Sequence, residues 1–540
     1  MSPIYHKGRK IDSDPARSIF DYADALKIRV PTSCGRSGEC HECIVAVSEG
    51  TEALNSPTSS EYFLSDNYRL ACQAYPVDME KKIEFEVLRR QPKILTQSIK
   101  RPIEIEPLVV RKKQGVYRDD IRIDSYHGQI YGIAIDLGTT TVVINLVDLE
   151  NGQILYTTSF ENPQRFGGSD IMNRISYDGG PYQGELQQVI ISAINFEIGD
   201  MCRKLGFHRR RIYDVVIVGN STMRDILFGI DVQTIGQRPY KSLTELSCES
   251  GKSTSTSLHA SAKDLNIRVF PLANVYSGPL IASHLGADVT ADLLAIGMDE
   301  QEDLVMLIDI GTNTEVVVGN RYGMMAASCP AGPAFEGGEI AYGMPGYEGA
   351  VETVRIVQDS VLCETIGKKD AQGICGSGLV DLLSELRRTD KMNELGVLEN
   401  NSTEFVFSKE NNLSLSRADI SSLAQAKAAN YSGQFIVMRN FGVSPDMISK
   451  LYLSGGFANY INPNNAASIG FIANIDENRI HKIGNSSLEG ATLMLVSTKM
   501  RSIAEDLVKS ISHIELETTE DFFEIFVEGC MFKPMSVNNP

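Results

Sequence analysis

Four of the ten cysteines of this 540-residue chain lie within its first 72 residues. Three of them form a C-x5-C-x2-C loop, Cys34, Cys40 and Cys43, in the stretch PTSCGRSGECHECIV, and Cys72 follows alone in RLACQ. A [2Fe–2S] cluster needs four thiolate ligands, and a tight loop can supply three of them while a fourth reaches in from elsewhere. We therefore expect one [2Fe–2S] cluster on these four cysteines.

Two other interpretations of the cysteines stay open, a zinc site and four unrelated buried thiols. Structural zinc sites usually use two separate C-x2-C pairs, whereas three of these cysteines share one loop, which favours the cluster. Gly35 and Gly38 suit a loop that curls around a cluster, because glycine adopts positive φ without steric cost. Backbone N–H groups of such a loop can point at the sulfur atoms.

Two similar stretches later in the chain indicate a second kind of chemistry. In each, an apolar strand ends in Asp and is followed by a turn of Gly with Thr or Asn. The residues are Asp136, Gly138, Thr139 and Thr140 in the first stretch, and Asp309, Gly311, Thr312 and Asn313 in the second. Backbone N–H groups and hydroxyls of such turns can hold phosphate. An Asp at the strand end is placed to hold Mg²⁺ directly or through water.

A third turn, Ser454-Gly455-Gly456, follows the apolar strand in KLYLSGGFANYINP. Gly455 and Gly456 have no Cβ and would let a flat group approach the backbone closely. The stretch GICGSGLVDLL predicts a glycine-rich turn at the start of a helix, and we expect a further nucleotide contact there.

Residues 329–351 are rich in Pro, Ala and Gly, which predicts an ordered loop near the second phosphate turn. Glu336 and Glu339 lie in this loop. They could act near Mg²⁺ or contact a partner, and a role as turn-capping carboxylates fits equally well.

Composition and charge exclude several classes of function. The chain has 69 Asp and Glu against 51 Lys and Arg, a net charge of −18, which argues against nucleic-acid binding. No apolar run approaches the ~20 residues needed to cross a bilayer. The N-terminal MSPIYHKGRK is not followed by an apolar stretch, so we expect no signal peptide. These features predict a cytoplasmic protein whose cysteines do not form disulfides.

The elements that must position these residues fall into four predicted parts, 1–91, a linker at 92–127 with one strand, 128–304 and 305–540. In the first part PIYHKGRKI and IEFEVL predict strands, and ARSIFDYADAL predicts a helix capped by Asp14. This order resembles the β-grasp [2Fe–2S] ferredoxins, of the branch with five residues in the first gap. The last two parts each contain one strand–turn–strand copy, 173 residues apart, which indicates a duplication. Near the C-terminus GATLMLVSTKMRSIAEDLVKSI predicts one helix.

The two Asp–Gly–Thr turns followed by the Gly–Gly turn resemble the superfamily of acetate kinase, sugar kinases, actin and heat-shock chaperone ATPases. This resemblance implies two ribonuclease-H-like halves that close over ATP and Mg²⁺, with phosphates at the two turns and adenosine at Gly455 and Gly456. It also implies that Asp136 and Asp309 are the catalytic carboxylates. The expected fold class is therefore α+β and α/β multidomain, a β-grasp ferredoxin domain followed by a duplicated ribonuclease-H-like ATPase region.

Nearly the whole chain resembles one family, the reductive activators of corrinoid proteins, found in anaerobic methyl-transfer and acetogenic metabolism. The resemblance includes PAGPAFEGGEI, GICGSGLVDLL and FVEGCMFKP. It implies that the chain passes one electron through the cluster and reduces Co(II) corrinoid to Co(I), with ATP hydrolysis, on the corrinoid protein of a methyltransferase system. The chain has no D-x-H-x-x-G stretch, so we expect the corrinoid to arrive on that partner.

Several points stay open at this stage. The low-potential electron donor is not identified, and the oligomeric state, with a homodimer as one option, is not fixed. Two alternative functions also remain, an activator of another low-potential enzyme such as a radical dehydratase, and a nucleotide-gated redox sensor.

Overall fold

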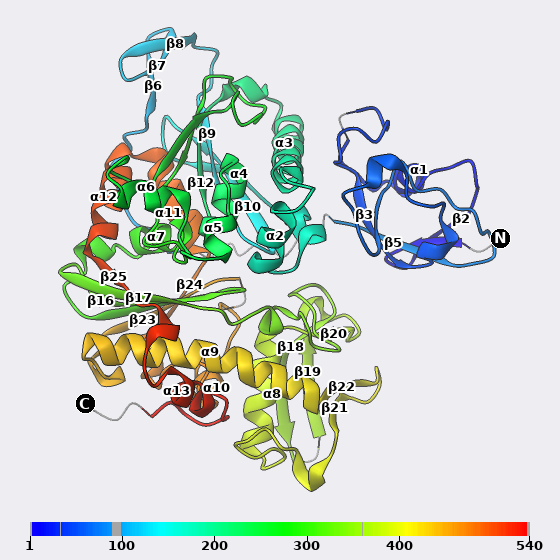
Figure 1. Ribbon diagram of the computed structural model, residues 1–540, viewed down its shortest axis with the longest axis vertical. Helices are drawn as coiled ribbons and strands as arrows, with labels where there is room; N and C mark the ends of the chain where they lie inside the picture. The colour runs from blue at the N-terminus through cyan, green and yellow to red at the C-terminus, as the bar shows by residue number, and fades with distance from the viewer. Residues whose placement is uncertain (1–2, 33, 89–98, 359, 457, 537–540) are drawn as a thin grey trace.

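The computed structural model describes residues 3–32, 34–88, 99–358, 360–456 and 458–536. Figure 1 shows a small N-terminal domain beside α2 and α3, with two larger halves stacked above one another. Within this described part of the chain, no helix has the length and apolar character required to span a membrane.

The N-terminal domain is a mixed five-stranded sheet with strand order β2-β1-β5-β3-β4, in which β1 pairs in parallel with β5. The elements are β1 (Pro3–His6), β2 (Arg9–Asp12), α1 (Ile19–Ala25), β3 (Ile44–Glu49), β4 (Tyr68–Leu70) and β5 (Ile83–Val87). The β-grasp fold expected from the sequence is confirmed. The predicted cap is wrong, because α1 begins after Ser18, whose side chain and that of Asp21 form a capping box. Asp14 instead accepts the Tyr22 hydroxyl hydrogen bond on its backbone oxygen.

The range 92–127, predicted as a linker with one strand, contains a three-stranded antiparallel sheet. Its strands are β6 (Val109–Lys112), β7 (Gly115–Arg118) and β8 (Ile121–Ser125), and residues 92–98 lie outside the described residues. Val109 and Val116 are fully buried against the core between the two halves. The sheet forms because these few apolar side chains have a neighbouring core to pack against, which the weak local periodicity did not reveal.

The first half is built on a six-stranded sheet with order β11-β10-β9-β12-β14-β13. Its strands are β9 (Tyr131–Leu137), β10 (Thr141–Asp148), β11 (Ile154–Glu161), β12 (Ile212–Val218), β13 (Leu258–Ser261) and β14 (Asn274–Ser277). Its helices are α2 (Ile171–Asp178), α3 (Glu185–Leu205), α4 (Ser221–Phe228), α5 (Gln233–Gly236), α6 (Leu243–Glu249) and α7 (Ala287–Ala295), with the short helices η3 (Pro163–Gly167) and η4 (Arg209–Arg211).

The second half has a six-stranded sheet with order β24-β23-β15-β16-β17-β25 and smaller sheets beside it. Its strands are β15 (Val305–Ile310), β16 (Thr314–Asn320), β17 (Gly323–Cys329), β18 (Ala350–Val357), β19 (Ser360–Thr365), β20 (Gly373–Ile374), β21 (Glu404–Ser408), β22 (Leu413–Ser416), β23 (Lys450–Ser454), β24 (Ile480–Gly484) and β25 (Ile511–His513). Its helices are α8 (Gly376–Arg388), α9 (Arg417–Phe441), α10 (Pro463–Ser468), α11 (Ser486–Val496), α12 (Thr498–Leu507) and α13 (Phe522–Gly529), with the short helix η6 (Ala334–Glu336).

The two large sheets repeat one topology. In each, a central strand pairs antiparallel with the next strand, which pairs antiparallel with a third: β9, β10 and β11 in one sheet, β15, β16 and β17 in the other. On its other side the central strand pairs in parallel with a later strand, β12 or β23. The duplicated ribonuclease-H-like architecture expected from the sequence is therefore confirmed.

The single helix predicted near the C-terminus is two helices, α11 and α12. Ser497 between them is extended, with φ −148° and ψ 118°. The break is stabilised by Glu106, whose N–H donates to Val496 O at 2.9 Å and whose C=O accepts from Thr498 N–H at 2.9 Å. This pairing with a segment almost 400 residues away has no local sequence signal.

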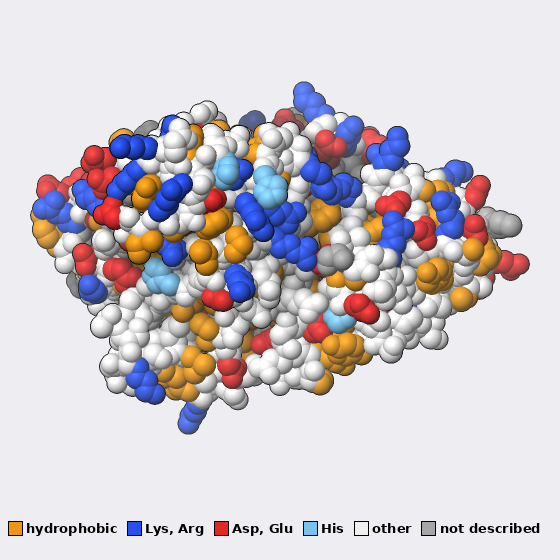
Figure 2. Space-filling view, turned by 90° about the horizontal axis from the view of Figure 1, so that it is seen from above, with side chains coloured by type: hydrophobic (Ala, Val, Ile, Leu, Met, Phe, Trp, Pro, Cys, Tyr) orange, Lys and Arg blue, Asp and Glu red, His pale blue; other side chains and the backbone are white. Residues whose placement is uncertain are grey.

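Charge is unevenly distributed over the surface. The end of α3 and η4 carry five Lys or Arg residues between positions 203 and 211. Figure 2 shows Lys and Arg side chains gathered near the middle of the face seen from above, although the chain has a net charge of −18.

Candidate functional site

The four N-terminal cysteines lie in the loop between α1 and β3 and in the turn after β4, where they form two pairs. Cys43 Sγ lies 3.4 Å from Cys72 Sγ, and both thiols are buried. Cys34 and Cys40 are half-buried, and the Sγ atom of each lies 4.0 Å from Thr32 Oγ1. The structure thus places the four predicted ligands in two pairs, Cys43 with Cys72 and Cys34 with Cys40.

The loop geometry and the thiol pKa values suit a cluster bound by thiolates. Gly35 and Gly38 have φ of +65° and +90°, in the left-handed region that glycine adopts freely. Burial raises the pKa of the Cys34 thiol, but hydrogen bonds from Ser37, Cys40 and the Gly38 backbone lower it to about 5 overall. The loop therefore stabilises negative charge on sulfur, as a cluster ligand requires.

The pKa values of the two buried thiols, Cys43 and Cys72, shift in opposite directions. The hydrogen bond from Cys43 lowers the pKa of Cys72 to about 7 and raises that of Cys43, because the two sulfurs share one proton. Among the described residues, no three His, Cys, Asp or Glu side chains converge as they would around one metal ion. Four cysteine thiols are the donor set of a [2Fe–2S] cluster, so these residues would fit one if it were bound across both pairs.

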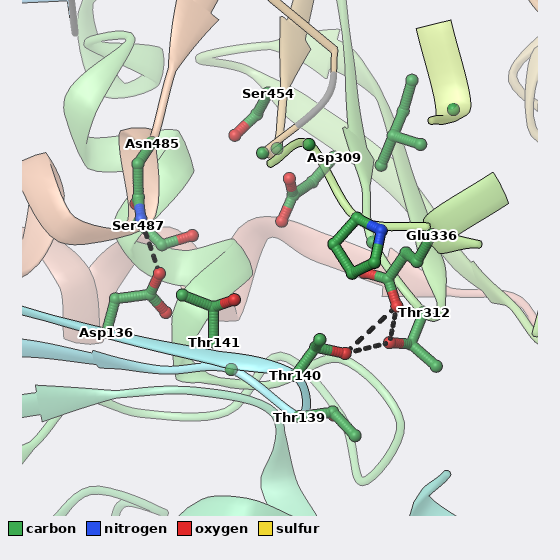
Figure 3. Close-up of a pocket in the computed structure, with 18 of the residues that line it drawn as sticks. Asp136, Thr139, Thr140, Thr141, Asp309, Thr312, Glu336, Ser454, Asn485 and Ser487 are labelled. Atoms are coloured by element: carbon green, nitrogen blue, oxygen red, sulfur yellow. Dashed lines mark hydrogen bonds between the residues drawn. The ribbon is translucent and has the colours of Figure 1, made fainter. Parts of the chain in front are cut away.

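The nucleotide-type turns from both halves line one cavity of about 300 Å³ between the two sheets. Figure 3 shows their side chains pointing into it from opposite sides. All ten predicted residues line it, namely Asp136, Gly138, Thr139, Thr140, Asp309, Gly311, Thr312, Asn313, Gly455 and Gly456. The start of α8, predicted as a further contact, lines it through Gly376 and Ser377.

Two glycines in these turns are required by close backbone approach. A Cβ at Gly138 would lie 2.6 Å from Thr141 O, which the Gly138 N–H binds at 3.1 Å to close the turn. Gly455 has φ +106°, and a Cβ there would lie 2.1 Å from Ile310 O. Any larger residue would push the third turn away from the second, so these positions fix the shape of the cavity.

The cavity is acidic. Burial, with a smaller contribution from the charge of Asp309, raises the pKa of Asp136 to about 7, although Asn485 Nδ2 donates to Asp136 Oδ2 at 2.7 Å. Burial and the same neighbouring charge raise the pKa of Asp288 to about 7. Burial also raises the pKa of Asp309 and, to a greater extent, that of Glu315.

These carboxylates have no cationic side chain to compensate them. Among the described residues, no Lys, Arg or His lines the cavity. Several carboxylates and hydroxyls around one space are the oxygen ligands that Mg²⁺ prefers, so the residues present fit a nucleotide that binds together with a divalent cation.

Glu336 joins the two halves above the phosphate turns. Its Oε2 accepts hydrogen bonds from Thr140 Oγ1 at 3.1 Å and from Thr312 Oγ1 at 2.7 Å, and Figure 3 shows this bridge. Burial raises the pKa of the Glu336 carboxyl. Glu339, three residues later, is exposed and does not line the cavity. Of the two glutamates left open by the sequence, only Glu336 therefore reaches the site.

Sequence reasoning missed Asp288, Glu315 and Asn485. Asp288 and Asp292 are spaced four residues apart on α7, an otherwise apolar helix, and this pattern is a signal that could have found them. Glu315 interrupts the buried strand β16. Asn485 caps α11 and meets Asp136 across 349 residues of sequence, so no local pattern marks it.

Comparisons with known proteins match nearly the whole chain. Residues 4–77 match the 2Fe-2S iron-sulfur cluster binding domain, residues 131–301 the RACo middle region, and residues 303–539 the C-terminal domain of RACo, the ASKHA domain. A solved structure of a reductive activator for corrinoid, iron-sulfur protein superposes with a TM-score of 0.71 at 27% identity, covering 99% of both chains.

Two curated relatives are also similar. The corrinoid activation enzyme RamQ of Eubacterium limosum is 28% identical over 97% of both chains. The [Co(II) methylated amine-specific corrinoid protein] reductase of Methanosarcina barkeri is 22% identical over 74% of this chain and 76% of its own length.

Proposed function

The chain belongs to the family of RACo-type reductive activators, and from this premise we propose that it reduces the Co(II) corrinoid of a partner protein to Co(I), with ATP hydrolysis. The observation that carries the proposal is the presence of a thiolate-rich loop and a two-sided acidic nucleotide cavity in one chain. The matching relatives are named for corrinoid activation and for reduction of a corrinoid protein.

We propose Cys34, Cys40, Cys43 and Cys72 as the cluster ligands, on the support of the contact between Cys43 and Cys72 and of the lowered thiol pKa values of Cys34 and Cys72. A bound [2Fe–2S] cluster supplies one-electron transfer. The domain limits at 91, 127 and 304 stay part of the proposal, as do a low-potential electron donor and a homodimer.

At the nucleotide site, Gly138–Thr140 and Gly311–Asn313 hold the phosphates, and Gly455 and Gly456 hold the adenosine. Asp136 and Asp309 bind Mg²⁺ directly or through water. The support for these roles is that all these residues line one cavity and that its carboxylates have no other positive partner among the described residues.

Coupling to ATP is chemically required if the corrinoid potential lies below that of the cluster. An acceptor on the order of 100–200 mV more negative costs about 2–5 kcal/mol for each electron. ATP binding and hydrolysis supply this free energy by changing the coordination of the corrinoid acceptor or the lifetime of its complex with the chain.

The direct test mixes the anaerobically purified protein with ATP, a low-potential reductant and a Co(II) corrinoid protein, and follows the Co(I) absorption. Wild type and Cys363→Ser, a matched control outside the cysteine loop, should produce Co(I). Cys40→Ser should not. Equal activity of Cys40→Ser would exclude an electron route through this cluster.

The redox-sensor alternative predicts another outcome. In a sensor, Asp136→Ala and Asp309→Ala would alter nucleotide affinity but leave electron delivery intact. In an ATP-coupled reductase both variants lose turnover, and the same absorption assay separates the two.

A further inference from the structure

The cysteine loop lies against the first turn of α3. His41 Nδ1 hydrogen-bonds Glu185 Oε2 at 2.8 Å, and the Tyr62 hydroxyl donates to Glu185 Oε1 at 2.6 Å. Gln188 Nε2, one turn later, donates to the backbone oxygen of Cys40 at 3.1 Å. The proposed cluster ligand Cys40 is therefore fixed from outside its own domain.

The short helix η3 reaches the same loop through one intermediate residue, Phe63. Phe166 lies edge-on to Phe63, with ring centroids 5.7 Å apart, and both side chains are buried. Phe63 in turn stacks on His41 at 4.2 Å. The Tyr177 hydroxyl, from α2, donates to Phe63 O at 2.6 Å. Aromatic packing thus continues without a gap from η3 to the residue that follows Cys40.

The other end of η3 holds the first phosphate turn. Asn162, the cap of η3, donates from Nδ2 to Gly138 O at 2.9 Å and from its backbone N–H to Thr140 O at 2.8 Å. Arg174 of α2 donates to Thr139 O at 2.7 Å. All three carbonyls of the turn are therefore bound by η3 or α2, so the turn cannot shift around a phosphate without moving these elements.

A further bond ties η3 to α3. Gln164 Nε2 donates to Leu186 O at 3.0 Å, next to Glu185. Asn162, Gln164 and Arg174 are all nearly fully buried. A close-packed interior of this kind transmits small displacements instead of absorbing them.

From these contacts we propose that η3 couples the phosphate turn Gly138–Thr140 to the cysteine loop, with Phe166 and Glu185 as the positioning residues. Nucleotide at the turn fixes η3, and η3 fixes the cysteine loop on α3. This rests on the proposed function, in which the turn binds nucleotide phosphate and the loop holds the cluster. By linkage, the state of the loop affects nucleotide affinity by the same factor.

Hydrogen–deuterium exchange on the cluster-loaded protein tests the coupling without a corrinoid partner. In wild type, Mg²⁺ with a non-hydrolysable ATP analogue should slow amide exchange in residues 34–43 at least threefold. In Phe166→Ala this slowing should disappear. The affinity for the analogue should fall by no more than the coupling factor, which linkage makes equal for the two sites. The control Phe207→Ala, which removes a ring that packs on Tyr131 at the far end of α3, should behave as wild type.

Glu185→Gln is the second variant, for the case that Phe166→Ala does not fold. Its matched control is Glu150→Gln, a carboxylate that also accepts from a tyrosine hydroxyl, at 3.1 Å from Tyr126, away from both sites. Glu185→Gln should weaken the protection and the nucleotide-induced change in the EPR spectrum of the reduced cluster. Protection that is absent in wild type, or unchanged in both variants, would overturn the coupling. Failure of Co(II) reduction in wild type would instead overturn the proposed function.

Discussion

The buried carboxyl of Asp136 should make the nucleotide-free protein less stable as pH rises, and Asp136→Asn should remove this effect. Burial raises its pKa to about 7 in the folded state from 3.8. A raised carboxyl pKa means that the folded state binds the proton more tightly than the unfolded state. Stability from this group is therefore fully present below pH 3.8 and is lost as pH rises to about 7 and beyond.

The size of the effect follows from the shift. About 3 pKa units at 1.36 kcal/mol each give about 4 kcal/mol as the largest loss. Between pH 6 and pH 8, where a folded protein can be compared, the same group contributes about 1.4 kcal/mol. For a unit of the size of the first half of the ATPase region, this free-energy change corresponds to about 3–5 °C in Tm. Asn is uncharged and can still accept the bond from Asn485 on its amide oxygen.

Thermal unfolding monitored from pH 6 to 8 in the absence of nucleotide checks this. From pH 6 to pH 8, the Tm of wild type and of the exposed control Asp231→Asn should fall by several degrees. The Tm of Asp136→Asn should fall less, and this variant should be more stable than wild type at pH 8. Mg²⁺ with an ATP analogue at 100 times its Kd should stabilise wild type by about 2.7 kcal/mol and Asp136→Asn much less. Parallel pH profiles for wild type and Asp136→Asn would refute the assignment of a raised pKa to this carboxyl.

Other changes test single contacts. Glu336→Gln should slow ATP hydrolysis about 100-fold with little change in nucleotide affinity, because the carboxylate between the two Thr hydroxyls is lost. Equal hydrolysis rates in Glu336→Gln and in the exposed control Glu339→Gln would count against this prediction. Gly455→Ala should lower nucleotide affinity more than tenfold in a calorimetric titration. The control Gly456→Ala, whose Cβ would meet nothing within 4 Å, should still fold normally. Unaltered nucleotide binding by Gly455→Ala would contradict the steric argument. Cys72→Ser should abolish the EPR signal of the reduced protein, and an intact signal would remove Cys72 from the ligand set.

The sequence predicted those parts of the molecule whose chemistry is local. The cysteine loop, the two Asp–Gly–Thr turns and the Gly–Gly turn each have a specific backbone shape. This shape requires glycine at particular positions, so the spacing of the glycines is visible in the sequence. The repeated stretches around Asp136 and Asp309 also predicted two similar sheets. Similar strand–turn–strand sequences have the same hydrophobic pattern and therefore form similar buried strands. For these reasons the fold class and the cavity-lining turns follow from short stretches of sequence.

The remaining features depend on contacts between distant segments. The β6–β8 sheet forms because the core between the halves accepts Val109 and Val116, and the break at Ser497 exists because Glu106 pairs there. Glu336 meets Thr140 across 196 residues. Local propensity carries no information on such pairs, so only the folded chain shows that the loop at 329–351 reaches across to the first half.

The acidity of the cavity and the fixing of its first turn have a joint consequence. Nucleotide phosphates are negatively charged and enter a space lined by carboxylates, without a cationic side chain among the described residues. A nucleotide that binds here would therefore need its own cation, which in the proposed function Asp136 and Asp309 would hold. In the proposed function, loss of the γ-phosphate would remove a partner of the turn Gly138–Thr140. Because the carbonyls of this turn are bound by Asn162 and Arg174, the proposed coupling predicts that this change reaches η3 and, through Phe166, the loop that carries the cysteines.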